Sequence, residues 1–555
     1  MNISKIFQNL LKNKYSQVYT VLFFVLLLFI GLSIFKDYGL STDEPFHRTI
    51  GYYWYISLLE IFSNNYELIE ATKEKFNTMY WSDYLNDGKL IQYGIFFDTI
   101  TAFIEEILII EETKNAFYLK HISTFLFFFL STVFFYKIIN LRFNNHLFSI
   151  IITFFYVSSP RIFAESFYNG KDIVFMSLIV CALYYALKSF DKLNYKSIIL
   201  FSIFSALATN IRIMGILIFS LFLVFLFLNF FEEKNFLKKN VFKFLVLIFL
   251  FPSVVYLFWP FLWNSPIDNF IFTIKSFANY DWIGSVFYLG DYYKGYDLPW
   301  HYIPVWIIAT TPIIFSLIFF IGFVIIILRF SKNFLNLSTV NKMWKNSNQQ
   351  KDFFILIFFI TPIFLIIFLN STLYTGWRHL YFIYPCIIYF IGVGLKFLLE
   401  IKINIFYKKM IYSIIALSLI INSYNLIKLH PYQNVYFNIL FEKKANKLFE
   451  IDYWGLGNKE ALEFLLNKKK GNRDIDIKLA SSTPLAYSML LLDKSKITNF
   501  SFIGTLNKNQ TYIFTNYVFQ KNQNFEKKYS IPSNYDKIYS LKRGNIVINE
   551  IFERK

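Results

Sequence analysis

The stretch VYTVLFFVLLLFIGLSIFK, residues 18–36, carries a single charge at its last position and is long enough to cross the ~30 Å hydrocarbon core of a bilayer. It has no small-residue cleavage site and more apolar runs follow, so it is interpreted as a retained membrane span rather than a signal peptide. Similar runs lie at roughly 117–138, 146–159, 172–190, 196–209, 211–230, 241–262, 302–329, 353–370, 379–399 and 409–428. The sequence therefore predicts a polytopic α-helical membrane protein with about eleven transmembrane helices. The runs at 146–159 and 196–209 are short, so we expect those helices to extend into their flanks or to be broken beside a cavity.

The composition excludes a soluble protein of this length. Of the 555 residues, 56% are hydrophobic, 22% aromatic and only 17% charged. The net charge of +18 comes from lysines scattered among Asn, Ile and Phe, which does not indicate a nucleic-acid-binding patch. Cys181 and Cys386 both fall inside predicted spans, so no structural disulfide is expected.

The distribution of basic residues predicts the orientation in the membrane. With the N-terminus inside, the inside loops hold 21 Lys plus Arg and five acidic residues, whereas the first outside loop, 36–116, holds six basic and fourteen acidic residues. Short loops rich in Lys and Arg stay on the cytoplasmic side. We therefore expect a multi-pass protein of the cell inner (plasma) membrane with a cytoplasmic N-terminus, and we expect its polar clusters to face outward.

The first outer loop is too long for a simple turn. Apolar or small residues recur at helical spacing from Ile50 to Phe62 and again from Ile100 to Leu108. Both segments are interpreted as amphipathic helices lying in the membrane interface, the second with Glu105 and Glu106 on its wet side. Packing over the spans is the alternative role for each helix. Such a loop would form a floor beside the membrane for a substrate that is partly lipid.

The composition becomes ordinary after about residue 430. Helical periodicity at 458–468 and 484–492 alternates with the strand-like DIDIKLA, TYIFTNYVF and NIVINEIF. The chain is therefore divided into a transmembrane catalytic module, 1–429, and a small extracytoplasmic α/β domain, 430–555. This domain contains no Gly-rich phosphate loop, Cys/His metal spacing or nucleophile elbow. The tract HPYQNVYFN, 430–438, lies at the join and is a candidate lining of the outer cavity.

The stretch GLSTDEPFHRTIGYYW, residues 39–54, crowds two carboxylates and an imidazole just after the first span. A capping box of Ser41 and Glu44 explains Glu44 well and Asp43 partly. It does not explain His47, which shares their helix face. Carboxylates at a membrane boundary are costly unless they are paired or used. Asp43 is therefore a candidate catalytic residue.

Two later clusters could bind an anion. The segment PRIFAESFYNGKD supplies Arg161, Glu165, Lys171 and Asp172 between two spans, although Asn-Gly within it also fits an ordinary polar turn. The tract TGWRHLYFIYP, 375–385, puts Arg378 and His379 just outside a span. Interfacial anchoring is the alternative role for this tract. Arginine, however, presents a planar fork that matches phosphate oxygens, and this face of the protein is poor in positive charge.

Together these parts suit one class of reaction. A departing lipid phosphate needs cations at the water–membrane boundary, and an acceptor hydroxyl needs a carboxylate base to take its proton. Sugar transfer from a polyprenyl phosphate fits this pattern. The candidate phosphate ligands are Lys171, Arg378, His379 and Arg161. The candidate residues of the substrate cavity are His47, Asp172, Arg212, His301 and Tyr381.

The long outer loop that opens with Asp-Glu, the later Lys-Asp pair and the Arg-His-aromatic-Pro tract resemble the GT-C fold glycosyltransferases. The resemblance is to the bacterial branch of glycosyltransferase family 39, of the dolichyl-phosphate-mannose protein mannosyltransferase type, and covers residues 1 to about 430. It implies that Asp43 is the catalytic base with support from Glu44. It also implies that Lys171, Arg378 and His379 contact the phosphate of a polyprenyl (undecaprenyl or dolichyl) monophosphate donor, and that the anomeric centre is inverted.

The resemblance leaves the acceptor open among a protein hydroxyl, lipid A, another glycan and a lipid. No cofactor is certain, and a divalent metal is possible because some relatives on this fold use one. Its candidate ligands are Asp43, Glu44, Glu165 and Asp172. Two other functions are alternatives: a flippase or transporter of lipid-linked glycans, and a ligase or polymerase that joins whole glycan chains. A transporter would place polar residues near the middle of its helices, whereas several spans here are almost wholly apolar.

Overall fold

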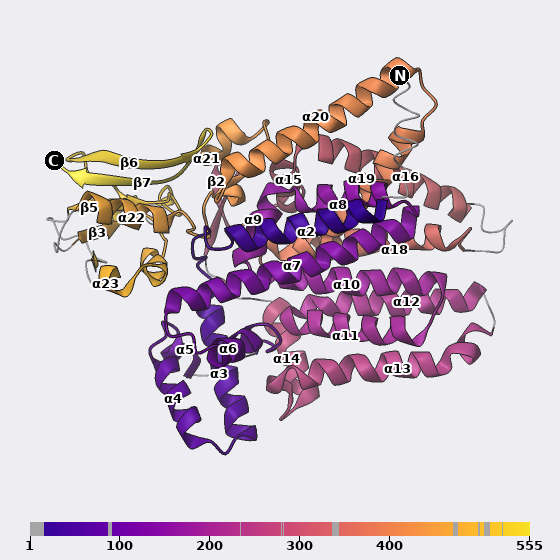
Figure 1. Ribbon diagram of the computed structural model, residues 1–555, viewed down its shortest axis with the longest axis horizontal. Coiled ribbons are helices and arrows are strands. Elements are labelled where there is room, and N and C mark those ends of the chain that lie inside the picture. The colour runs from indigo at the N-terminus through magenta and orange to yellow at the C-terminus, as the bar shows by residue number, and fades with distance from the viewer. Residues whose placement is uncertain are drawn as a thin grey trace.

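The computed structural model describes residues 16–86, 92–232, 235–278, 280, 282, 284–335, 343–469, 475–497, 500–503, 511–523 and 526–555. Long helices run side by side through most of the molecule, and a small sheet lies at one end of them (Figure 1). The predicted fold class, a polytopic helical chain with a small C-terminal α/β region, is confirmed.

Eight helical segments of the described chain are long and apolar enough to cross a membrane. They are α2 (Ser16–Ile34), α7 (Thr113–Phe143), α10 (Asp172–Asp191), α13 (Phe236–Leu257), α16 (Ile313–Leu335), α18 (Ser347–Phe368), α19 (Tyr384–Glu400) with the 3-10 helix η3 (Arg378–Ile383) before it, and α20 (Ile405–Leu429). A bent pair, α8 (His146–Val157) and α9 (Pro160–Tyr168), would make a ninth.

The expected number of about eleven spans is thus larger than the number of helices that reach full length. The runs at 196–209 and 211–230 form α11 (Tyr195–Ile211) and α12 (Ile216–Glu232), joined by η1 (Ile213–Gly215). Each has 17 residues, which at 1.5 Å per residue gives about 26 Å, short of a full crossing.

Proline lies at two breaks between helices, one at the end of a predicted run and one inside another. The run at 146–159 continues into α9 after a 70° bend, at Ser159 and Pro160. The run at 302–329 is two helices, α15 (Tyr302–Thr310) and α16, because Pro312 follows Thr311, whose backbone is extended. A residue before proline is disfavoured in the helical conformation, and proline has no N–H to continue the ladder.

The segment predicted to be the first outer loop contains α3 (Glu44–Phe62), α4 (Tyr66–Asn77), α5 (Ser82–Asn86) and α6 (Asp98–Ile107). Both predicted helices are therefore present. The expected wet side of α6 is wrong for Glu105, which is 3% exposed because Arg48 and Lys75 bind its carboxylate at 2.6 and 2.9 Å. Instead the apolar Phe103 and Ile107 are exposed.

The chain after α20 first crosses the end of the bundle and then forms a sheet. The crossing holds η4 (Gln433–Val435), η5 (Glu442–Lys444) and α21 (Ala445–Leu448). The sheet has the order β4-β3-β5-β7-β6, with β3 parallel to β4 and β5 and with β7 antiparallel to its neighbours. Its strands are β3 (Ile475–Leu479), β4 (Phe500–Ile503), β5 (Tyr512–Thr515), β6 (Tyr535–Arg543) and β7 (Ile546–Arg554). Its helices are α22 (Asn458–Lys468), η6 (Leu485–Leu491), α23 (Lys494–Ile497) and α24 (Glu526–Tyr529).

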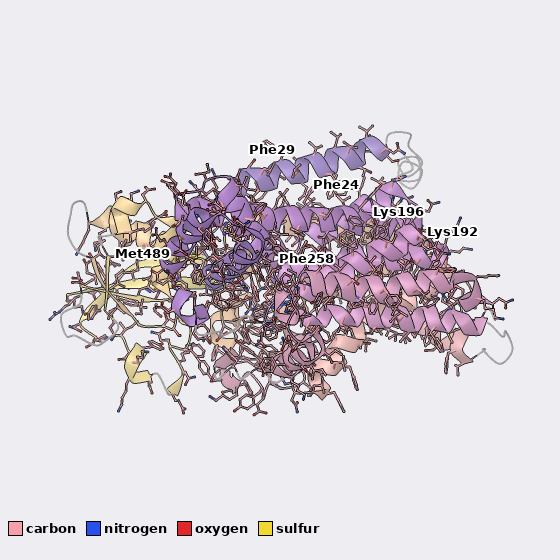
Figure 2. All side chains as sticks on the ribbon, turned by 90° about the horizontal axis from the view of Figure 1, so that it is seen from below. Phe24, Phe29, Lys192, Lys196, Phe258 and Met489 are labelled. Atoms are coloured by element: carbon pink, nitrogen blue, oxygen red, sulfur yellow. The ribbon has the colours of Figure 1, made fainter. Side chains whose placement is uncertain are left out.

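The C-terminal sheet region and the outer-loop helices share one end of the bundle. Leu491 packs against Leu40 and Phe117, and Lys114 pairs with Asp493 at 2.9 Å. Figure 2 shows Met489 of η6 at this end, whereas Lys192 and Lys196 lie at the opposite end. A two-stranded hairpin, β1 (Ser285–Tyr288) and β2 (Asp291–Lys294), follows η2 (Pro260–Leu262) and α14 (Pro266–Ala278). We use "outer end" for the end that carries the C-terminal region.

Candidate functional site

Asp43 directly precedes α3, at the end of the short connection that follows the first span. It is the N-cap residue of the helix, but its side chain makes no capping hydrogen bond. Its carboxylate instead accepts a hydrogen bond from Nη1 of Arg378 at 2.9 Å. The Asp43 side chain is 39% exposed and that of Arg378 is 5% exposed. Asp43 is therefore an accessible carboxylate held by a buried cation.

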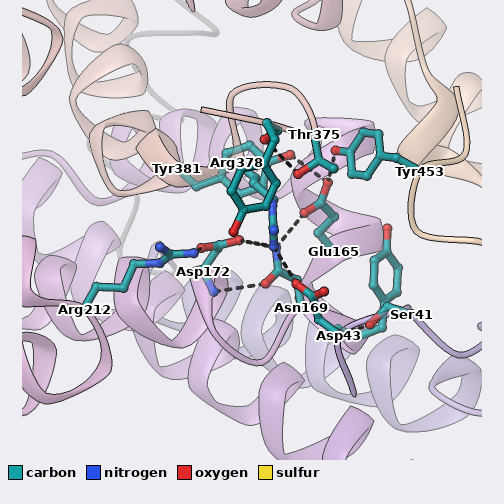
Figure 3. Close-up of polar contacts among 12 residues, drawn as sticks. Ser41, Asp43, Glu165, Asn169, Asp172, Arg212, Thr375, Arg378, Tyr381 and Tyr453 are labelled. Atoms are coloured by element: carbon teal, nitrogen blue, oxygen red, sulfur yellow. Dashed lines mark hydrogen bonds and ion pairs between the residues drawn. The ribbon is translucent and has the colours of Figure 1, made fainter. Parts of the chain in front are cut away.

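Arg378 begins η3 and joins two carboxylates from different parts of the chain. Its Nη1 contacts Asp43 at 2.9 Å and Asp172 at 3.5 Å. Its guanidinium lies 5.0 Å from the ring centroid of Tyr374 and 4.7 Å from that of Trp454. Aromatic faces stabilise a guanidinium electrostatically and restrict its orientation. The charge of Arg378 is thus fixed beside Asp43 (Figure 3).

Asp172 is the first residue of α10 and is only 1% exposed. The positive end of the helix dipole favours a carboxylate at this position. Arg212, the residue after α11, pairs with its Oδ1, and the Asn169 side chain donates to its Oδ2 at 3.0 Å. We call Asp43, Asp172, Arg212 and Arg378 the Arg378 cluster.

A second set of contacts lies beside this cluster. The Glu165 Oε1 accepts hydrogen bonds from the hydroxyls of Tyr381 at 2.7 Å and Tyr453 at 3.4 Å, and its Oε2 accepts from Asn169 at 2.8 Å. Arg161 donates from Nη1 to the Tyr453 hydroxyl at 3.2 Å. These five residues form the Glu165 network, and Asn169 links it to Asp172 (Figure 3).

Several buried nitrogens in and around these two sets find no hydrogen-bond partner among the described residues. They are Nε and Nη2 of Arg161, Nε of Arg212, Nε of Arg378 and Nδ1 of His379. A buried donor without a partner costs about 1–3 kcal/mol. An anion bound at the outer end of the bundle would provide acceptors for donors of this kind.

Lys171 adds a further basic side chain, next to Asp172 in the sequence. Its Nζ lies 3.1 Å from the ring centroid of Tyr93. The pKa of Lys171 is well below its ordinary value because burial disfavours the ammonium ion and Arg212 repels it. Anions that approach Lys171 would oppose both effects. The described part of the site therefore favours the arrival of a negative group.

Two solved structures of ArnT from Cupriavidus metallidurans are similar to this chain. The one in the apo state is 11% identical with a TM-score of 0.47, and the match covers 97% of this chain and 98% of that chain. The one bound to undecaprenyl phosphate is 10% identical with a TM-score of 0.44, covering 96% of this chain and 98% of that chain. No protein-family model and no curated protein matches the chain. At so low an identity and TM-score, the reaction has to be inferred from the site itself.

The structure brings most of the predicted site residues to the outer end. Asp43, Asp172, Arg212 and Arg378 are in contact, and Tyr381 and Arg161 belong to the adjoining Glu165 network. His379 packs edge-on against Tyr374 at 4.7 Å between ring centroids. His301 contacts Tyr288 of β1, with its Nδ1 2.7 Å from the hydroxyl of that tyrosine.

Glu44 supports the turn that carries Asp43. It is 1% exposed, its Oε2 accepts from the Ser41 N–H at 2.7 Å, and its Oε1 is 2.9 Å from Nε2 of His121. The glutamate half of the predicted capping box is therefore present. The serine half is not, because the Ser41 hydroxyl donates to the carbonyl of Tyr168 at 3.3 Å.

The four candidate metal ligands do not gather into a metal site. In the described chain no group of three or more His, Cys, Asp or Glu residues is placed to hold a metal ion. Arginine nitrogens contact Asp43 and Asp172, and tyrosine hydroxyls and an amide contact Glu165, while Glu44 faces His121. These neighbours are donors, which suit carboxylates but not a cation.

Sequence reasoning missed Asn169, Tyr374, Tyr453 and Trp454. The Asn-Gly pair at 169–170 is typical of a turn, and the sequence of the C-terminal region contains no recognisable functional motif. The tract at 430–438 does reach the site region, since the Phe437 ring lies 5.5 Å from the Arg161 guanidinium. The stretch DYWGLGN, 452–458, with its two glycines, is the one available signal, but it does not indicate which side chains it contacts.

His47 makes the stability of this region depend on pH. It is 9% exposed, and its pKa is well below the ordinary 6.5 because burial disfavours the imidazolium and Lys171 and Lys120 repel it. Below pH 6.5 the unfolded chain takes up a proton that the folded chain does not, so stability is lost as the pH falls.

We expect His47→Gln to reduce that loss by up to about 1.4 kcal/mol per pH unit. The measurement is the Tm of purified wild type and variant at about pH 7.5 and about pH 5.5. The same fall in Tm for both proteins would contradict this expectation.

Proposed function

We propose that this protein is an integral membrane glycosyltransferase that moves a hexosyl or pentosyl group from a polyprenyl-phosphate-linked donor to an acceptor hydroxyl. The observation that supports this most directly is the pair formed by the accessible Asp43 carboxylate and the buried Arg378 guanidinium. Asp43 would accept the hydroxyl proton and Arg378 would stabilise the departing phosphate. The Oδ2 of Asp43 and the Nη1 of Arg378 are 2.9 Å apart at the outer end of the bundle.

Further support comes from the three motifs that resemble the GT-C glycosyltransferases of family 39. The Asp-Glu pair, the Lys-Asp pair and the Arg-His tract meet in one place although they are far apart along the chain. We assign the chain to this fold type on that basis. We also place the N-terminus in the cytoplasm and the outer end on the extracytoplasmic face of the plasma membrane.

In the proposed reaction Asp43 accepts the proton of the acceptor hydroxyl as the oxygen forms its bond to the anomeric carbon. The bond from that carbon to the phosphate oxygen breaks, and its electron pair leaves with the polyprenyl phosphate. Arg378 and Lys171 stabilise the negative charge that develops on this phosphate. The buried Nε and Nη2 of Arg161 donate further hydrogen bonds to it. The products are the glycosylated acceptor, polyprenyl phosphate and a protonated Asp43.

The exposed Asp43 carboxylate supports a hydroxyl group as the acceptor, but it does not indicate which class of molecule carries that hydroxyl. A protein side chain, lipid A, another glycan and a lipid all present one. Flipping of a lipid-linked glycan is less well supported, because ion pairs of the described spans lie toward the bundle ends, as for Arg142 with Asp352 and Arg378 with Asp43.

The test is transfer of labelled sugar by the purified protein. Synthetic undecaprenyl and dolichyl phosphate sugars are offered as donors, and an extract of the cell envelope of the source organism supplies acceptors. We expect label to move to an acceptor and free polyprenyl phosphate to appear in equal amount. Nucleotide sugars are the control donors and should be inert. Transbilayer movement of an intact donor in proteoliposomes without transfer would instead show a flippase.

A further inference from the structure

The segment 451–458, IDYWGLGN, leaves the C-terminal region and reaches into the candidate site. We propose that Trp454 in this segment is a positioning residue, which holds Arg378 and the turn that carries Asp43 in the relative positions that the transfer reaction requires. The C-terminal region would then be part of the active site rather than an appended domain. This inference rests on the proposed function, because positioning is defined here relative to the sugar-transfer step.

Trp454 contacts Arg378 through its ring and the residue before Asp43 through its backbone. Its ring is 2% exposed, and the Arg378 guanidinium lies 4.7 Å from its centroid. Its backbone carbonyl accepts a hydrogen bond from the N–H of Thr42 at 3.0 Å, one residue before Asp43. The side chain of Trp454 thus covers the Arg378 guanidinium, and its backbone holds the turn that carries Asp43.

The neighbouring Tyr453 extends the same contact into the Glu165 network. Its hydroxyl accepts from Arg161 at 3.2 Å and donates to Glu165 at 3.4 Å. Because Asn169 joins Glu165 to Asp172, the segment reaches the Arg378 cluster by two routes. A displacement of the segment would therefore disturb both carboxylates that Arg378 contacts.

The segment is rigid enough to act as a support. Asp452 is 0% exposed, and its carboxylate accepts from the N–H groups of Leu456 at 3.2 Å and Gly457 at 2.8 Å. Gly455 has a φ of +72°, a conformation that favours glycine. A Cβ on Gly39 would lie 2.2 Å from the carbonyl oxygen of Leu456, so this turn packs directly on the chain that leads to Asp43.

Three variants separate positioning from stability. Trp454→Leu removes the aromatic face, Trp454→Phe keeps one, and both leave the carbonyl that binds Thr42 in place. Phe514→Leu is the matched control, because Phe514 is 0% exposed in the core of the C-terminal sheet. Each purified protein is assayed for kcat, for donor KM and for Tm.

We expect Trp454→Leu to lower kcat on the order of 10- to 100-fold, since a small misplacement of a catalytic group can cost this much. Trp454→Phe should regain most of the rate. Phe514→Leu should lower the Tm and leave kcat per folded molecule unchanged. A wild-type kcat in Trp454→Leu, or a loss of kcat in Phe514→Leu as large as that in Trp454→Leu, would overturn the proposal.

A second readout does not depend on the transfer reaction. Phenylglyoxal modifies accessible guanidinium groups, and mass spectrometry of the peptide that contains Arg378 reports its rate of modification. We expect faster modification of Arg378 in Trp454→Leu than in wild type and in Phe514→Leu. Equal rates in all three proteins would overturn the contact even if transfer is observed. Faster modification without any sugar transfer by wild type would keep the contact and refute the proposed function alone.

Discussion

Asp43→Asn is expected to abolish sugar transfer and to leave donor binding intact. The amide has the shape of the carboxylate and still offers an oxygen to Nη1 of Arg378, which lies 2.9 Å from Asp43. It cannot take the proton of an acceptor hydroxyl. Loss of a general base typically costs about 10²- to 10⁴-fold in rate. The measurement is kcat for labelled sugar transfer together with the affinity for undecaprenyl phosphate.

The matched control for this variant is Asp37→Asn in the same loop. Asp37 is also a partly exposed carboxylate near the end of the first span, but it binds His430 at 2.8 Å rather than Arg378. We expect this control to keep the wild-type rate. An Asp43→Asn protein that turns over within about threefold of wild type would refute the base assignment, given the size expected for such a base.

Arg378→Lys is expected to weaken binding of polyprenyl phosphate and to lower kcat, although the charge is kept. A lysine cannot present a planar fork to a phosphate or stack as flatly between Tyr374 and Trp454. We expect the affinity and the rate each to fall at least tenfold, which corresponds to about 1.4 kcal/mol for each.

The control for Arg378 is a second arginine pair in the bundle. Arg142 binds Asp352 through Nε at 2.7 Å and Nη2 at 2.8 Å, and both side chains are largely buried. Arg142→Lys should lower the Tm without changing the affinity for polyprenyl phosphate. The phosphate role of Arg378 fails if Arg378→Lys binds the lipid as wild type does, or if both variants lose affinity equally.

The helices and much of the candidate site could be predicted because their signals are local. Each apolar run is long enough to define a helix without reference to the rest of the chain. Polar clusters interrupting such runs indicated Asp43, Asp172 and Arg378 for the same reason, since charge at a membrane boundary needs a partner or a use. The breaks at Pro160 and Pro312 also have a local cause, although the second was not foreseen.

The errors arose where a distant partner changed the environment of a residue. Glu105 was expected to be solvated because its own helix is amphipathic, but Arg48 and Lys75 from α3 and α4 bury it. His301, also expected at the outer cavity, has Tyr288 of the β1–β2 hairpin as its partner, a residue that the local sequence around His301 does not indicate. No periodicity within α6 or near His301 encodes those neighbours.

The sequence by itself determined that this chain crosses a membrane many times and that carboxylates and cations gather near the ends of particular spans. Only the tertiary structure decided which of them pair. Asp43 and Arg378 are 335 positions apart, and Tyr453 and Glu165 are 288 apart. The physical reason is that hydrophobicity acts on each segment alone, whereas an ion pair depends on how the packed helices and the C-terminal region bring distant side chains within a few ångströms.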